Sequence, residues 1–290
     1  MANIYTLRDF FFGQWSSMVR LDGKTVIITG ANTGIGKETT RDLAKRGARI
    51  IMACRDIIKA GEAQREIVAE SGNQDVIIRK LDLADTNSIR EFAEEINNEE
   101  KQLHILVNNA GVMMCPYSKT ANGFEMQFGV NHLGHFLLTF LLIDLLKQSA
   151  PSRIIILSSM AHSWGTIKLD DINSERSYHS RTAYGQSKLA NILCTRSLAK
   201  RLAGIVRTKL KRHMNLGLLC MWKLVRPFTK TPVQGAQTSI YCALEPGLDS
   251  YTGGYFSNCR PSSCTRAARD DEMAQKLWDI SCQMLGINWK

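Results

Sequence analysis

The stretch Thr29-Gly-Ala-Asn-Thr-Gly-Ile-Gly36 directly follows the apolar run Lys24-Thr-Val-Ile-Ile28, and a helical pattern begins within it. A glycine-rich turn between a strand and a helix exposes backbone amides, which hydrogen-bond well to a pyrophosphate. The sequence therefore predicts a dinucleotide-binding turn. Its expected contacts are Gly30, Asn32, Thr33, Gly34, Ile35 and Gly36.

Runs rich in Val, Ile and Leu alternate with helical patterns along the chain. This alternation predicts an α/β fold, with a parallel sheet covered on both faces and ligands bound at the carboxyl ends of the strands. We expect residues 1–20 to be an irregular lead-in and residues 21–290 to form one domain. The expected strands are 24–29, 48–54, 75–81, 103–108 and 153–159, and the expected helices are 34–46, 57–71, 86–100, 124–148 and 182–203.

A second segment, Tyr184-Gly-Gln-Ser-Lys188, lies near the start of the last of these helical patterns. Residues four apart share one helix face, so the Lys188 ammonium can sit beside the Tyr184 phenol and lower its pKa. A proton donor of this kind, combined with a dinucleotide-binding turn, predicts hydride transfer to or from a carbonyl group.

The type of dinucleotide is indicated by the end of the second strand, Ala53-Cys54-Arg55. A carboxylate at this place would accept from a ribose 2′-hydroxyl and repel a 2′-phosphate. The strand-end residues here are neutral, and the planar guanidinium of Arg55 can hold a phosphate with two hydrogen bonds. The pattern favours NADP(H) over NAD(H). The alternative interpretation of Arg55 is an exposed residue in a loop.

The net charge of +10 is concentrated in one part of the chain, because thirteen Lys or Arg and no Asp or Glu lie between Arg176 and Leu244. Within that part, segment 214–228 combines Leu, Met and Trp with cations, which suits peripheral contact with an anionic membrane. The other interpretation is a helix that covers the substrate and keeps a solvated basic side. No nucleic-acid-binding motif accompanies the charge, so nucleic acid is not an expected partner.

The amino-acid composition indicates the class of protein to which the chain belongs. A chain of 290 residues with 44% apolar and 22% charged residues suits one soluble globular domain. Its eight cysteines include no CxxC pair, which indicates free thiols in a reducing compartment. The longest apolar stretch, Leu133 to Leu146, contains His135 and Asp144, so we expect a buried or interface helix and no membrane span.

Two further groups of residues invite a functional interpretation. His132 and His135 lie three apart on a helix, but no third ligand accompanies them, so we predict packed histidines and no metal. Tyr178 lacks a Lys at the required spacing and is interpreted as a loop residue. Met113 and Met114 suit a lipophilic substrate or a place in the core, and Trp164 lies in a loop that can shape the substrate entrance.

The combined motifs resemble those of short-chain dehydrogenases/reductases, and the longer phrases resemble the retinol dehydrogenase branch of that family. The resemblance covers residues 20 to 290 and implies a Rossmann-type, doubly wound sheet. It also implies that Asp82 and Leu83 lie near the adenine, and that Asn109, Ala110 and Gly111 lie beside the cofactor. The residues that carry it are 29–36, 81–83, 108–111, 113–120, 129–136, 158–159, 184–188 and 230–238.

The same resemblance implies the catalytic roles. Tyr184 is the expected proton donor to the substrate oxygen. Lys188 hydrogen-bonds the cofactor ribose and, with the oxidised nicotinamide, lowers the pKa of Tyr184. Ser159 donates to the substrate oxygen, and Asn131 holds a water that connects Lys188 to solvent. Ser158 is the alternative to Ser159, which we prefer because side chains alternate at a strand end.

The chain departs from the family pattern after the helix that carries Tyr184. In the family pattern, a sixth strand and a Pro-Gly turn follow this helix. Here the segment from Gly204 to Leu210 leads directly into the sequence that normally comes after that turn, so we expect the sixth strand and the turn to be missing. The strand near 253–257 is a candidate to pair with the fifth strand instead; otherwise the chain folds poorly. Two functions follow: an NADP(H)-dependent enzyme that interconverts retinal, or another lipid aldehyde, and the alcohol, or a catalytically impaired dinucleotide-binding variant.

The resemblance also bears on localisation. Retinol dehydrogenase relatives are commonly anchored to the endoplasmic reticulum by an apolar N-terminal segment, whereas residues 10–15 here suffice only for interfacial contact. We therefore expect peripheral association with the cytosolic face of that membrane, or a cytoplasmic protein. The sequence leaves the oligomeric state open.

Overall fold

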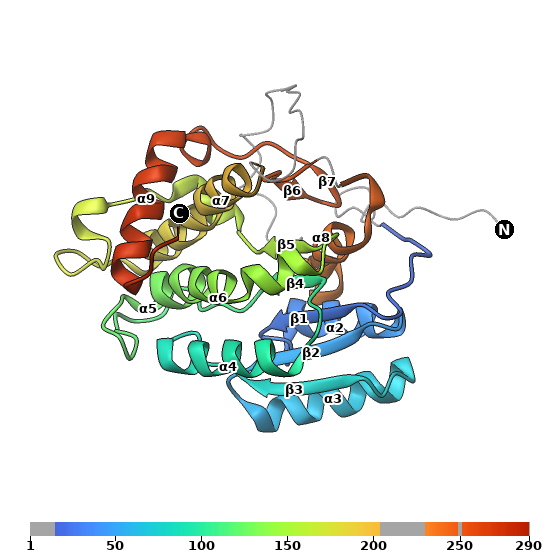
Figure 1. Ribbon diagram of the computed structural model, residues 1–290. Helices are drawn as coiled ribbons and strands as arrows, with labels where there is room; N and C mark the ends of the chain where they lie inside the picture. Colours follow the sequence, from blue (N-terminus) through green and yellow to red (C-terminus); the bar gives the residue numbers. More distant parts are fainter. Residues whose placement is uncertain (1–14, 204–229, 249–250, 290) are drawn as a thin grey trace.

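The computed structural model describes residues 15–203, 230–248 and 251–289. Its centre is a five-stranded parallel sheet with the strand order β3-β2-β1-β4-β5 (Figure 1). The pairing of Val26 with both Ile50 and Ile105 places β1 in the middle of the sheet. The expected parallel α/β fold is confirmed. The strands are β1 (Thr25–Thr29), β2 (Arg49–Cys54), β3 (Val76–Lys80), β4 (Ile105–Asn108) and β5 (Arg153–Ile156).

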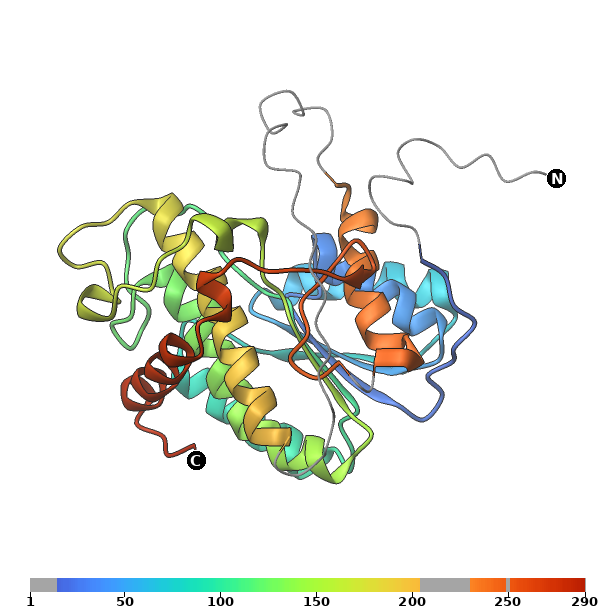
Figure 2. The same ribbon diagram turned by 90° about the horizontal axis from the view of Figure 1, so that it is seen from above.

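Helices cover both faces of the sheet, so the molecule has three layers (Figure 2). Successive side chains of a strand point to opposite faces. Val26 and Ile28 accordingly pack on one side and Ile27 on the other, and all three are completely buried. The first layer contains α2 (Gly34–Lys45), α3 (Ile57–Ser71) and α8 (Pro232–Leu244), and the second contains α4 (Thr86–Glu99), α6 (His135–Gln148), α7 (Ser180–Ala203) and α9 (Asp271–Leu285).

The expected helix 124–148 is three segments in the structure. A short α5 (Met126–Phe128) leads into a π-helical segment, η1 (Gly129–Gly134), and then into α6. The Glu125 carboxylate accepts from the first amides of α5, and a Cβ at Gly134 would lie 2.6 Å from the Leu83 carbonyl oxygen. A π-helical turn of this kind is rare and often occurs at functional sites.

These three segments together are long and apolar enough to cross a membrane. However, 83% of the most apolar window is buried inside the protein. The stretch therefore packs as a core helix, as its interrupting polar residues predicted. Of the described part of the chain, no other helix meets the length and composition needed for a membrane span.

The strand near residue 253 does not pair with β5, and that expectation was wrong. Residues Phe256–Ser257 form β6, which pairs antiparallel with β7 (Arg260–Pro261) in a separate two-stranded sheet. Asn258 and Cys259 both have positive φ, the conformation of a tight hairpin turn, so the chain folds back on itself. Within the described ranges no strand pairs with the far edge of β5, whose residues Ile154, Ile155 and Ile156 are only half-buried.

The remaining described segments join these layers. Short 3-10 turns occur at η2 (Met160–Trp164), η3 (Leu169–Asp171), η5 (Pro246–Leu248) and η6 (Ala267–Arg269). In the expected lead-in, Trp15 donates to the Glu245 carboxylate at 3.1 Å and stacks edge-on against Tyr241. The seven cysteines in the described residues are free. Residues 1–14, the departure at Gly204 and the segment 214–228, rich in Leu, Met and Trp, lie outside the described residues.

Candidate active site

The glycine-rich turn connects β1 to the N-terminus of α2 at the carboxyl end of the sheet. Gly30 and Gly34 have positive φ, and a Cβ at Gly36 would collide with the Gly30 carbonyl oxygen and the Asn109 amide. Thr33 makes no side-chain cap, and the first turn of α2 contains no acidic residue. The first amides of α2 therefore carry an unopposed partial positive charge, which fits the pyrophosphate of a dinucleotide.

The segment after β4 is fastened to this turn. The Asn109 side-chain amide donates to the Thr29 carbonyl oxygen at 2.8 Å, and the Thr29 hydroxyl accepts from the backbone amides of Asn109 and Ala110. Asn109 and Ala110 are thus brought against the turn. The role of Thr29 is one that the sequence interpretation missed; its place immediately before the first glycine is the only signal that could have suggested it.

The end of β2 lies beside the same turn. Burial raises the pKa of the Cys54 thiol to about 11, so this strand-end side chain is neutral. The Asp56 carboxylate accepts from the Lys59 amide and caps α3. Arg55 is exposed, with no hydrogen bond or ion pair to the described residues. The cation is therefore available to a ligand, whereas the nearest carboxylate is directed to its own helix.

Asp82 and Leu83, which we expect near the adenine, differ in burial and in hydrogen bonding. Asp82 is half-buried, and its carboxylate accepts from the Ala84 amide at 2.9 Å. The Leu83 side chain is buried in the core between the sheet and α6. Leu83 as a whole is 7% exposed, and its carbonyl oxygen lies against Gly134.

Tyr184 and Lys188 lie on one face of α7, as their spacing predicted. Lys188 Nζ is 5.7 Å from the centre of the Tyr184 ring and donates to the Leu157 carbonyl oxygen at 3.2 Å. Burial lowers the pKa of Lys188 to about 8, because the ammonium loses its hydration in the protein interior.

The expected depression of the Tyr184 pKa is not found in the structure. Burial raises the pKa of Tyr184, and a side-chain hydrogen bond with Ser159 opposes that rise. Desolvation penalises the phenolate more than the hydrogen bond stabilises it. The phenol is therefore held in its protonated form.

The two candidate serines after β5 have different partners. The Ser158 hydroxyl donates to the Lys188 carbonyl oxygen at 2.8 Å, so it is engaged with the backbone of α7. The Ser159 hydroxyl contacts the Tyr184 phenol and also accepts from the Ala161 amide at 3.2 Å. The structure thus places Ser159, and not Ser158, beside Tyr184. The expected strand 153–159 ends its ladder at Ile156, but its last residues still reach the site.

Asn131 lies inside η1 and is completely buried. Its side chain accepts from the Val112 amide at 2.8 Å and donates to the Val112 carbonyl oxygen and to the Ser187 hydroxyl. A Cβ at Gly111 would lie 2.9 Å from Asn131 Oδ1 and 3.6 Å from Lys188 Nζ. Both polar groups thus face the same small region over Gly111, although they make no direct hydrogen bond.

The remaining candidates are placed as follows. His132 and His135 are buried and hydrogen-bonded, which confirms the interpretation as packed histidines. Tyr178 lies in the loop before α7, as predicted, and its hydroxyl donates to the Cys115 carbonyl oxygen at 2.6 Å. Among the described residues, no cluster of His, Cys, Asp and Glu has a metal-binding arrangement.

Apolar side chains are exposed in the loops at this end of the sheet. Met113, after β4, is 63% exposed, and Trp164, after β5, is 45% exposed, so neither belongs to the core. Trp164 lies against the helix turn that carries Tyr184, because a Cβ at Gly185 would come within 2.9 Å of its indole. Trp164 therefore presents apolar surface beside the first turns of α7.

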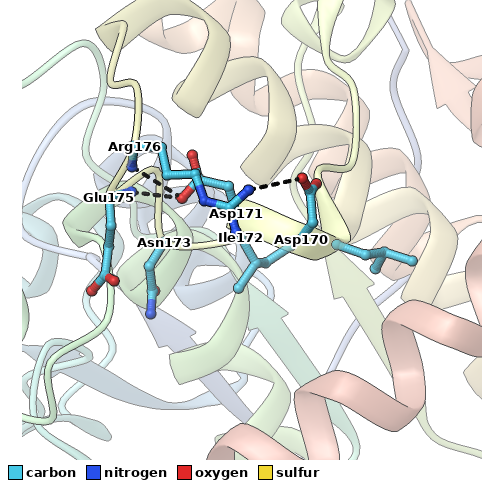
Figure 3. Close-up of a pocket in the computed structure, with 7 residues that line it drawn as sticks. Asp170, Asp171, Ile172, Asn173, Glu175 and Arg176 are labelled. Atoms are coloured by element: carbon cyan, nitrogen blue, oxygen red, sulfur yellow. Dashed lines mark hydrogen bonds and ion pairs between the residues drawn. The ribbon is translucent and has the colours of Figure 1, made fainter.

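A separate hollow of about 240 Å³ lies in the loop between η3 and α7 (Figure 3). The Asp171 carboxylate accepts from the amides of Glu175 and Arg176, and the Arg176 guanidinium pairs with Asp170. Glu175 and Asn173, which also line the hollow, are bonded to Lys119 and to the Glu125 amide, and none of the candidate catalytic or cofactor residues lines it. This hollow is not part of the site.

Comparison with known proteins establishes the family. The short chain dehydrogenase profile matches residues 24–209, and the chain therefore belongs to the short-chain dehydrogenase family, as its motifs predicted. It is accordingly an oxidoreductase with a nicotinamide dinucleotide, NAD(P)(H), as cofactor.

Individual members of the family are similar to this chain over most of its length. Retinol dehydrogenase 12 of Homo sapiens is 54% identical over 297 residues, with 98% of this chain and 94% of the relative covered. Retinol dehydrogenase 11 of Mus musculus is 54% identical (95% and 90% covered), and retinol dehydrogenase 14 of Homo sapiens is 49% identical (92% and 88% covered). A crystal structure from Mycobacterium paratuberculosis superimposes with a TM-score of 0.77 at 34% identity, with 95% and 99% covered.

The comparison also shows that residues are missing from this chain. The alignment with retinol dehydrogenase 12 is 297 positions long, whereas the whole chain has 290 residues. Some positions of that relative therefore have no counterpart here.

Proposed function

We propose that this protein is an NADP(H)-dependent oxidoreductase that interconverts retinal, or another lipid aldehyde, and the corresponding alcohol. The observation that carries the proposal is the meeting of Ser159, Tyr184 and Lys188, with the Lys188 ammonium facing Gly111, next to the segment that is fastened to the glycine-rich turn. The retinoid substrate class is supported by the names of relatives about half identical to this chain over most of its length.

In this proposal the cofactor is held by backbone and side-chain groups from several strand ends. The amides from Gly34 to Gly36 bind the pyrophosphate, Arg55 binds the 2′-phosphate, and Lys188 hydrogen-bonds the ribose. Asp82 and Leu83 would lie near the adenine. The bound nicotinamide supplies or accepts the hydride.

The chain's own groups handle the proton. In the reductive direction, Tyr184 donates its phenolic proton to the substrate oxygen while the Ser159 hydroxyl donates a hydrogen bond to the same oxygen. The raised pKa of Tyr184 keeps that proton in place until it is needed. The Lys188 ammonium, charged below about pH 8, then stabilises the phenolate that remains. Asn131 binds the water through which Lys188 exchanges protons with solvent.

A specific observation favours a second function, a catalytically impaired dinucleotide-binding protein. The described sheet has five strands, the outer face of β5 is only half-buried, and relatives contain residues that this chain lacks. In this alternative the turn after β1 still binds NADPH, while the nicotinamide is poorly oriented.

One experiment separates the two functions. Purified protein is titrated with NADPH by fluorescence, and NADPH oxidation is then followed with all-trans-retinal, beside a Tyr184→Phe variant. If the protein is the proposed enzyme, it should oxidise NADPH in the presence of retinal. The Tyr184→Phe variant should then have a rate lower by about a hundredfold or more, with unchanged NADPH binding. NADPH binding without turnover above that control would contradict the enzyme and support the impaired protein.

We also propose peripheral membrane contact through segment 214–228, whose Leu, Met and Trp side chains are flanked by the cations of the basic stretch 176–244, which suits an anionic surface such as the cytosolic face of the endoplasmic reticulum. Flotation with anionic liposomes tests this proposal. Binding should be seen at low salt and weaken at high salt, because headgroup attraction is screened. No flotation at low salt would remove the proposal.

A further inference from the structure

His135 is a buried polar residue to which the proposed mechanism gives no role. It lies in the first turn of α6, is 2% exposed, and has a hydrogen-bond partner at each ring nitrogen. Nε2 is 2.9 Å from the Thr29 hydroxyl, at the end of β1. Nδ1 is 3.1 Å from the backbone carbonyl oxygen of Asn131, inside η1. The imidazole therefore bridges the cofactor-binding turn and the π-helical segment.

The hydrogen-bond network assigns the direction of these contacts. The Thr29 hydroxyl accepts from two backbone amides, those of Asn109 and Ala110, each at 2.9 Å. A hydroxyl has two lone pairs and one hydrogen, so its hydrogen must be donated elsewhere. Of the acceptors in reach, His135 Nε2 at 2.9 Å is nearer than the Val107 carbonyl oxygen at 3.4 Å. Nε2 is then unprotonated, and Nδ1 carries the proton that is donated to Asn131.

The neutral ring that this direction requires is maintained by the surroundings. Burial, together with the nearby Lys188 charge, lowers the pKa of His135 to about 3, although the hydrogen bond to Asn131 acts in the opposite direction. The imidazole is therefore uncharged at neutral pH.

The two ends of this relay are the parts that must be aligned for catalysis. At one end, Thr29 fixes the amides of Asn109 and Ala110 against the glycine-rich turn. At the other end, the Asn131 side chain holds Ser187, which directly precedes Lys188 on α7. A shift of the turn relative to η1 would thus have to break one of the two His135 hydrogen bonds.

We propose that His135 is a positioning residue that aligns the cofactor-binding turn with the catalytic helix through a Thr29–His135–Asn131 hydrogen-bond relay. The inference rests on the proposed function, since it assigns a part in that same site to a residue outside it. An apolar side chain of similar size would fill the same space, but it would leave the Thr29 hydroxyl and the Asn131 carbonyl without their partner.

Two substitutions separate the two ends of the relay. In His135→Asn, the amide nitrogen takes the place of Nδ1, so the bond to Asn131 is kept and the bond to Thr29 is lost. In His135→Gln, the longer amide reaches Thr29 and leaves Asn131. We expect His135→Asn to weaken NADPH binding about tenfold with little effect on kcat, and His135→Gln to lower kcat about tenfold with little effect on NADPH binding. A residue that only fills the core would affect both quantities alike in both variants.

A double-mutant cycle measures the Thr29 end of the relay. In a Thr29→Val background, which lacks the hydroxyl, His135→Asn should cost no further NADPH affinity. In a Thr29→Ser background, which keeps the hydroxyl, it should again cost about tenfold. Equal losses in both backgrounds would show that the residues act independently and would overturn the relay.

A second measurement is independent of cofactor and activity. In protein labelled with ¹⁵N at histidine, the two neutral tautomers give distinct ring-nitrogen spectra, and the signals absent from His135→Asn belong to His135. We expect the Nδ1-protonated tautomer. An Nε2-protonated ring would overturn the relay, whether or not the protein binds NADPH. Failure of the wild-type protein to bind NADPH would instead contradict the proposed function.

Discussion

The most discriminating perturbation is Gly111→Ala. The added methyl would lie 2.9 Å from Asn131 Oδ1 and 3.6 Å from Lys188 Nζ, which places it between the two groups that we propose to share a water. Asn131 cannot swing aside, because its side chain is held by Val112 and Ser187. Gly111 is exposed and its φ lies outside the left-handed region, so alanine adds little backbone strain.

The magnitude follows from the bond that must break. Moving Asn131 Oδ1 away from the methyl gives up its hydrogen bond from the Val112 amide, which costs about 1–3 kcal/mol when the donor is left without a partner. If the transition state is destabilised by that free energy relative to the bound substrate, kcat decreases about 5- to 150-fold. The same loss should lower the free energy of unfolding by a similar amount, and NADPH affinity is measured alongside because Gly111 is expected to lie beside the cofactor.

The assay is NADPH oxidation with saturating all-trans-retinal, accompanied by thermal unfolding. Gly61→Ala is the matched control, because it makes the same change on the surface of α3, where the nearest atom to the new methyl is Arg65 Nη1 at 3.7 Å. That variant should keep full activity and gain about 0.5–1 kcal/mol of stability. A kcat for Gly111→Ala within twofold of the Gly61→Ala value would refute the reasoning.

Three further predictions concern single side chains. Ser159→Ala should lower kcat about a hundredfold, whereas Ser158→Ala should cost about 1 kcal/mol of stability with kcat within a few-fold of wild type; equal losses of activity would contradict this assignment. Arg55→Ala should weaken NADPH binding about tenfold and leave NADH binding unchanged, which parallel titrations would check. Lys188→Met should unfold at a higher temperature than wild type at pH 7, because burial of the ammonium depresses its pKa to about 8 in the folded protein. Since the unfolded chain holds that proton up to about pH 10.4, wild-type stability should rise relative to Lys188→Met between these values; a gap in melting temperature that stays constant over this range would disprove the explanation.

Much of the fold could be predicted because its signals are local. The expected helix 57–71 coincides with α3, where Asp56 caps the first turn and Gly72 adopts the left-handed conformation that ends it. The alternation of buried strands with helices was sufficient to predict a parallel sheet, because few arrangements bury both faces of such strands.

Other features depend on contacts between distant residues. The helix expected at 124–148 is interrupted by η1, where Gly134 packs against the Leu83 backbone about fifty positions earlier in the chain. The last strand pairs with its own hairpin partner, because positive φ at Asn258 and Cys259 turns the chain back before it can reach β5. Asn often adopts positive φ, but Cys rarely does, so the dipeptide Asn258-Cys259 is a weak turn signal in the sequence.

For the site, the sequence by itself determined the chemical groups: the turn from Gly30 to Gly36, and Tyr184 with Lys188 four residues later. Only the tertiary structure decided what surrounds them. It placed the Ser159 hydroxyl at the phenol and raised the pKa of Tyr184, where spacing alone predicted a decrease. It also joined His135 to Thr29 across 106 positions of the chain. The physical reason is that spacing fixes which side chains share a helix face, whereas desolvation and long-range hydrogen bonds depend on atoms that only folding brings together.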